Sequence, residues 1–133
     1  MKTIIITFIL GALFSISNIY ANEPEPKVLT NVETTESGTK KEIIYLDEDS
    51  SLPKDKTIMY YNTDDQMLSK CCYKWDGYKK WIGTRKYEYK YNAEGKIESV
   101  THTEWDDNKG DWADKSETTA HVYTNQGELM ATN

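Results

Sequence analysis

The sequence predicts an all-β protein, an antiparallel meander of seven or eight strands in consecutive hairpins of about 30 residues each. The first observation behind this prediction is a repeat. Tyr61, Tyr91 and Tyr123 each open the same pattern, which reaches an apolar residue six positions later. In the first two copies a tryptophan follows the tyrosine after fourteen residues. We therefore divide this part of the chain into copies at 61–90 and 91–122 and a partial copy at 123–133.

The second observation is an alternation of period two inside each copy. Tyr87, Tyr89 and Tyr91 occupy odd positions, and the residues between them are charged. A helix would scatter these rings around its cylinder, whereas a strand places them on one face. We expect Trp81 to share that face. The other same-face sets are Met67, Ser69, Cys71, Tyr73 and Trp75 in the first copy, and Ile97, Ser99, Thr101, Thr103 and Trp105 in the second.

The third observation is the placement of tryptophans and turn residues at opposite ends of each copy. Pairs of tryptophans flank two short polar connections, so each pair should be cross-strand neighbours near one end of the sheet. Glycine occupies the same turn position at 95 and 127, which indicates a positive φ there, and Asp65 takes that position in the first copy. The two tryptophan pairs are Trp75 with Trp81, and Trp105 with Trp112.

One irregularity predicts a bulge. Tyr91 lies ten positions after Trp81, but Tyr123 lies eleven positions after Trp112. In an unbroken strand Trp112 and Tyr123 would face opposite ways. We predict a β-bulge between Ala113 and His121 that returns them to one face.

The start of the chain is different in character. Lys2 precedes an apolar run that ends at Ala21, which is typical of a secretory signal peptide over residues 1–21. An uncleaved membrane anchor is the alternative. A proline-rich and acidic lead-in over 22–27 should be disordered, and a single domain should follow over 28–133. We expect its first strands at 28–35 and 39–46, then a polar loop at 47–55 that contains Pro53.

Composition restricts the possible partners and the core. The formal net charge of −6 makes a polyanion such as nucleic acid a poor partner. After signal cleavage no stable membrane insertion is expected. The core must come mostly from tyrosine and tryptophan, so we expect a twisted, curled sheet whose aromatic face covers itself. Cys71 and Cys72 are adjacent, so we expect two free thiols, Cys71 packed and Cys72 on the opposite face, with an intermolecular bridge as the alternative.

The repeated pattern resembles the small secreted proteins of unknown function from gut Bacteroidetes that carry Trp/Tyr hairpin repeats after a signal peptide. The resemblance covers roughly Lys41 to Met130 and implies a secreted all-β repeat, without an activity or catalytic residues. The residues that carry it are Tyr45, Pro53, Trp75, Trp81, Tyr87, Tyr89 and Tyr91.

The sequence contains no convincing catalytic or metal-binding motif. His102 and His121 are expected to be exposed strand residues without a shared metal. The acidic run from Asp47 to Asp49 is better explained as a solvated loop than as calcium ligands. Residues 106–117 echo an EF-hand loop, but Asp111 stands where glycine is required. Acidic pairs such as Glu98 with Glu104 and Asp106 with Asp107 occur by chance in an acidic chain, so we predict no catalytic residues, cofactor or metal.

The aromatic residues remain as the candidate site, and two interpretations stay open. They form the core, or they form an exposed face that stacks on sugars or holds a protein partner. We therefore expect a non-catalytic binding or interaction module, secreted or periplasmic. A structural envelope or surface component that self-associates is the alternative, and a small hydrolase comes third. The candidate binding surface is Trp75, Tyr78, Trp81, Trp105 and Trp112.

Overall fold

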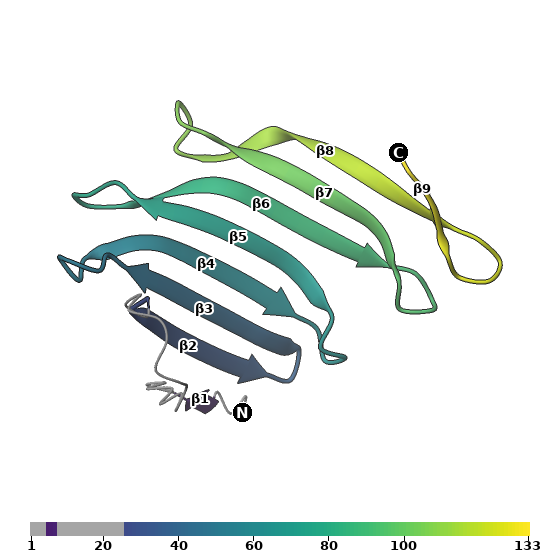
Figure 1. Ribbon diagram of the computed structural model, residues 1–133, viewed down its shortest axis with the longest axis horizontal. Helices are drawn as coiled ribbons and strands as arrows, with labels where there is room; N and C mark the ends of the chain where they lie inside the picture. Colours follow the sequence, from purple (N-terminus) through teal and green to yellow (C-terminus); the bar gives the residue numbers. More distant parts are fainter. Residues whose placement is uncertain (1–4, 8–25) are drawn as a thin grey trace, which may run out of the picture.

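A computed structural model describes residues 5–7 and 26–133, and the described residues form one antiparallel sheet (Figure 1). Each strand pairs with the next along the chain, so the order in the sheet follows the order in the sequence. The two edge strands do not pair with each other, and the predicted all-β meander is confirmed. The strands are β1 (Ile5–Thr7), β2 (Val28–Thr35), β3 (Gly38–Leu46), β4 (Pro53–Tyr61), β5 (Met67–Trp75), β6 (Trp81–Tyr91), β7 (Ile97–Asp106), β8 (Asp111–Tyr123) and β9 (Leu129–Thr132).

The connections gather at two ends of the sheet, on the left and right of Figure 1. The loops after β3, β5 and β7 form one end, which we call the Trp end because both tryptophan pairs lie beside it. The turns after β2, β4, β6 and β8 form the other, which we call the Tyr end. This separation confirms the predicted placement of tryptophans and turns at opposite ends.

The Tyr end repeats one turn three times, as the sequence predicted. In each copy the first side chain of the turn accepts hydrogen bonds from the N–H groups two and four residues later, in the manner of an Asx turn. These side chains are Asn62, Asn92 and Thr124. Three residues further on the backbone enters the left-handed region, at Asp65 (φ 59°), Gly95 (φ 78°) and Gly127 (φ 81°).

The loops of the Trp end are each held by an aspartate. The Asp76 carboxylate accepts hydrogen bonds from the backbone N–H groups of Tyr78, Lys79 and Lys80. Those backbone donors hold the pKa of Asp76 below its usual range. The carboxylates of Asp47 and Asp106 accept hydrogen bonds from backbone N–H groups of their own loops in the same way. The Asp47 carboxylate therefore serves to hold its own loop.

A bulge in β6 separates the tryptophans from the tyrosines, against our expectation. Cys72 pairs with Arg85 and Tyr73 pairs with Gly83, which leaves Thr84 as an extra residue. One extra residue turns all later side chains of the strand to the other face. Trp81 therefore lies on the face opposite Tyr87, Tyr89 and Tyr91, and the prediction that these four rings share a face is wrong. We call the two sides the tryptophan face and the tyrosine face.

The bulge predicted in β8 is present, but its consequence differs. Thr103 pairs with Ser116 and Trp105 pairs with Trp112, so three residues of β8, from Ala113 to Lys115, lie opposite Glu104 alone. Two extra residues leave the alternation of faces unchanged. Trp112 stays on the tryptophan face while Tyr123 lies on the tyrosine face, so the prediction that the bulge returns them to one face is wrong.

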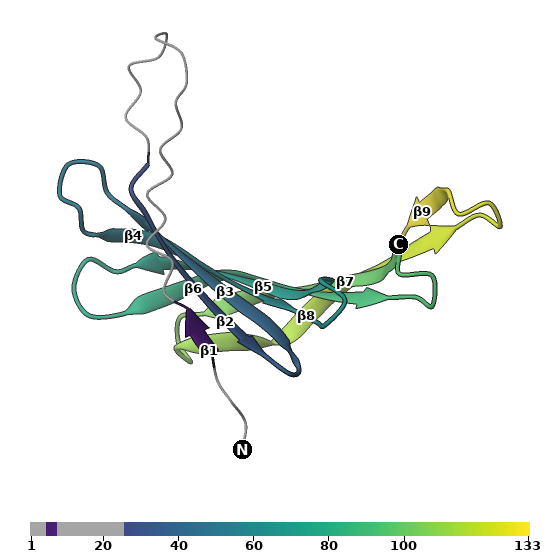
Figure 2. The ribbon, with the colours of Figure 1, turned by 90° about the horizontal axis from the view of Figure 1, so that it is seen from below.

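The sheet is a single curved layer (Figure 2), and no other described element lies over either of its faces. Among the described residues no side chain is fully buried, and the most buried ones are Thr103 at 4% exposure and Cys71 at 8%. The expectation that the curled aromatic face covers itself is therefore wrong. The physical reason is the bulge at Thr84, because rings divided between two faces cannot form one continuous apolar side.

Cys71 and Cys72 are free thiols, the first buried and the second half-exposed, and their strand partners place them on opposite faces, as predicted. β4 begins at Pro53, inside the expected loop, because the first residue of a strand tolerates proline.

The start of the chain is only partly described. Apart from Ile5–Thr7, the predicted signal peptide and residues 22–25 of the lead-in lie outside the described residues. No helix among the described residues has the length and apolar character needed to cross a membrane.

Candidate functional site

Five aromatic rings gather on the tryptophan face beside the Trp end. Trp75 and Trp81 are cross-strand neighbours whose ring centroids lie 5.2 Å apart, edge to face. Trp105 and Trp112 form the same kind of pair, also at 5.2 Å. The Trp112 ring on β8 also contacts the Tyr73 ring on β5 at 5.7 Å, so it reaches across the two strands between them. Both predicted tryptophan pairs are thus confirmed.

Lys56 joins the two groups of rings. It lies on β4 opposite Tyr73, with its Nζ 4.9 Å from the Tyr73 ring centroid and 4.6 Å from that of Trp81. A cation placed over two rings is attracted by their negative faces. Partial burial lowers the pKa of the Lys56 ammonium. We call the set of Lys56, Tyr73, Trp75, Trp81, Trp105 and Trp112 the aromatic platform.

Gly83 makes room for the platform. It lies on β6 opposite Tyr73 and is buried. A Cβ atom at this position would collide with Cε3 of Trp105 and would lie 2.8 Å from Cη2 of Trp112. Both indoles therefore rest on the bare backbone of β6, which is how Trp112 can reach Tyr73.

The platform rings are packed against each other but not covered. All five are partly exposed, and the burial of Tyr73 raises its pKa to about 12. Among the described residues the buried polar atoms without a hydrogen-bond partner are Asn31 Oδ1 and His102 Nε2. The indole nitrogens are not among them, so each reaches either water or a hydrogen-bond partner. The platform can therefore offer ring faces, N–H donors and one cation.

Four of the five residues predicted for the binding surface belong to this platform, and Tyr78 does not. Tyr78 is 77% exposed at the tip of the loop after β5, where its ring contacts Lys79. Sequence reasoning missed Lys56 and Gly83. An isolated glycine within a strand pattern signals a bulge or a close approach of other atoms, and both occur here. Nothing in the sequence singled out Lys56, because its role depends on strand pairing.

Both histidines lie in strands, as expected, but neither is fully exposed. His102 is half-buried, stacks on Tyr87 at 5.1 Å, and has a buried Nε2, because both lie on the tyrosine face opposite each other. His121 is also only half-exposed. Within the described residues no group of three or more acidic, histidine or cysteine side chains could hold a metal ion.

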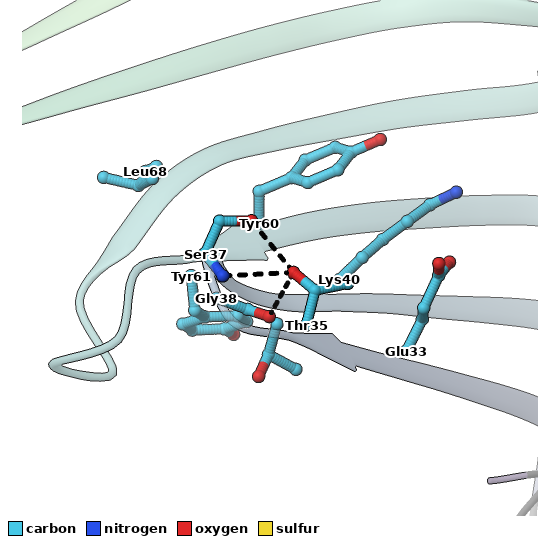
Figure 3. A pocket seen from close by; sticks show the side chains of 9 residues that line it. Glu33, Thr35, Ser37, Gly38, Lys40, Tyr60, Tyr61 and Leu68 are labelled. Carbon is cyan, nitrogen blue, oxygen red and sulfur yellow. Dashed lines mark hydrogen bonds between the residues drawn. The ribbon is translucent and has the colours of Figure 1, made fainter. Parts of the chain in front are cut away.

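A shallow recess of about 400 Å³ lies near the Tyr end, between the turn after β2 and the start of β5 (Figure 3). Tyr60 and Leu68 form its apolar wall, and Glu33 and Lys40 lie across from them. The hydroxyl of Thr35 is engaged by Ser37 and Gly38 of the turn itself. We do not assign a ligand to this recess.

The fold and the platform together define a class: a single-layer all-β hairpin-repeat protein with an aromatic surface at one end. Comparison of the chain with family models, with characterised proteins and with solved structures found no match. The function must accordingly be argued from the platform.

Proposed function

We propose that this protein is a non-catalytic binding module that acts outside the cytoplasm, secreted or periplasmic, and that it holds its ligand or partner on the aromatic platform. The observation that carries the proposal is the gathering of five rings from four strands on one uncovered face. A sheet face rich in apolar surface is normally buried against a second layer. Exposed clusters of tryptophan and tyrosine are the usual anchors of binding surfaces.

The apolar run that ends at Ala21 supports export. The protein recovered from the producing cell after export should begin at Asn22, which intact-mass spectrometry will show. A mass that retains residues 1–21 would contradict export by this route.

Tryptophan fluorescence tests the platform directly, since all four tryptophans of the chain belong to it. Acrylamide should quench the exported protein readily, as expected for partly exposed indoles. Titration with a panel of neutral and acidic oligosaccharides should then shift the emission of the wild type. Trp81→Ala should weaken the response, while Tyr91→Phe on the opposite face should leave it unchanged. If acrylamide quenches these indoles as poorly as it quenches tryptophans in a closed core, the proposal is overturned.

A second candidate is a structural envelope or surface component that associates with its own copies. The observation that favours it is an uncovered edge. β9 pairs with β8 only near Tyr123, and on the side of β8 away from β7 no described strand runs beside residues 111–119. An unpaired edge is a template for another chain, although the bulge and Lys115 weaken it here. Light scattering over a wide concentration range separates the candidates, and a monomer at every concentration would exclude this one.

A further inference from the structure

Resting on the proposed function, we infer that the platform binds an acidic glycan, with the rings stacking on the sugars and Lys56 pairing with a carboxylate. The inference starts from the position of Lys56. Its ammonium is held over the rings of Tyr73 and Trp81, which come from β5 and β6. The ion pairs of the described residues join Lys86 to Glu88, Lys96 to Glu94 and Lys109 to Asp114, and none involves Lys56.

A lysine held by rings and without a carboxylate partner is ready to receive one. Glu42 of β3 lies on the same face of the sheet, and it does not form an ion pair with Lys56. Two rings restrict the motion of the ammonium before any ligand arrives, which reduces the entropy lost on binding. An anionic group on the ligand would therefore gain a charge-assisted contact at this point.

The surroundings of the rings favour a sugar over a protein. A pyranose ring has an apolar C–H face and hydroxyl groups around its edge. The platform offers flat ring faces, and on the same face beside Trp105 lie two hydroxyl pairs, Thr103 with Ser116 at 2.8 Å and Thr101 with Thr118 at 2.9 Å. Thr103 is buried, so the exposed hydroxyls of these pairs are those of Ser116 and Thr118. In contrast, the core of a protein interface is depleted of lysine. Two copies stacked about a two-fold axis at this point would also bring their Lys56 side chains together.

The charge of the rest of the chain makes the role of Lys56 testable. The net charge of −6, with Asp76 and Asp106 in the neighbouring loops, opposes the approach of an anion. A platform without Lys56 should therefore prefer neutral sugars, and one with Lys56 should prefer acidic ones.

The test compares sugars that differ only in charge. Tetragalacturonate and a hyaluronan tetrasaccharide are each titrated into the exported protein beside their methyl esters, with tryptophan emission as the readout. At least one acid should bind about tenfold more tightly than its ester, which corresponds to about 1.4 kcal/mol. Lys56→Met should reduce the affinity for the acid to that for the ester, and Lys56→Arg should retain the preference. Lys90→Met is the matched control, because it removes the same charge from the same face at the Tyr end.

The outcomes separate the inference from the proposed function. Equal binding of acids and esters, or a preference that survives Lys56→Met, would overturn the acidic-glycan inference and leave the binding platform standing. Absence of binding to all four sugars would also overturn it, while the platform would still be judged by quenching and by the wider panel.

Discussion

The Trp end and the Tyr end of this sheet carry similar numbers of aromatic rings but use them differently. At the Tyr end the hydroxyl of Tyr91 donates a hydrogen bond to the Met67 carbonyl at 2.7 Å, and that of Tyr123 donates to the Ile97 carbonyl at 2.6 Å. Each tyrosine thereby ties its strand to the backbone of an earlier strand. At the Trp end the contacts are between rings, or between rings and Lys56.

The difference teaches which rings serve the fold and which are free for a ligand. A tyrosine whose hydroxyl is bonded to a backbone carbonyl of the neighbouring strand is committed to one position, and the contact recurs in two copies of the repeat. The platform rings are stabilised by burial, and each edge-to-face contact adds about 0.5–1.5 kcal/mol per pair. Such contacts remain when a ligand covers the outer side of the rings.

The largest effect should follow from filling the space under the indoles. Gly83→Ala should destabilise the protein by about 1–3 kcal/mol in urea unfolding, because the new Cβ displaces Trp105 and Trp112. An alanine in an ordinary strand position would instead be slightly stabilising. The same substitution in a Trp105→Ala background should cost much less. Equal costs in both backgrounds would show that the close approach does not matter.

Removing one tyrosine hydroxyl at the Tyr end should lower the free energy of unfolding by a smaller amount. Tyr91→Phe should lower the free energy of unfolding by about 1 kcal/mol, since the Met67 carbonyl loses its partner. Ligand binding at the platform should not change. Tyr89→Phe, on the same strand and face, is the control. If both variants lose the same stability, the hydrogen bond is not responsible.

Asp65 offers a test of the repeat itself. It occupies the left-handed position that glycine occupies in the other two copies, with φ of 59°. Asp65→Gly should stabilise the protein by roughly 0.5–1 kcal/mol, and Gly95→Asp should destabilise it by a similar amount. Thermal unfolding of the two variants beside the wild type measures both. If both substitutions change the stability in the same direction, the two turns are not equivalent.

The smallest effect concerns alkaline pH. The pKa of Tyr73 rises to about 12 through burial, so the folded protein keeps a proton that the unfolded chain loses near pH 10. The contribution of Tyr73 to stability should therefore be constant below pH 10 and should fall between pH 10 and about 12. Urea unfolding across this range should show a shallower slope in Tyr73→Phe. If the absorbance titration shows no tyrosine that ionises above pH 11, the raised pKa of Tyr73 is refuted.

Much of the architecture could be predicted from local pattern. The strands from Val28 onwards, the turns at Asp65, Gly95 and Gly127, and both tryptophan pairs follow from alternation and turn chemistry, which involve residues close in sequence. The bulge in β8 was visible as one additional residue between Trp112 and Tyr123. Its effect on the faces was not, because that depends on how many residues of β8 lie opposite Glu104.

The sequence by itself determined the hairpin repeat, its turns and the pairing of tryptophans, since each depends on neighbours along one strand or across one turn. Only the tertiary structure decided which rings share a face, because the extra residue at Thr84 is defined by pairing between β5 and β6. It likewise decided that Lys56 lies over Tyr73 and Trp81, and that Gly83 supports Trp105 and Trp112. These contacts join residues from separate strands, and their meeting depends on the register and curvature of the whole sheet.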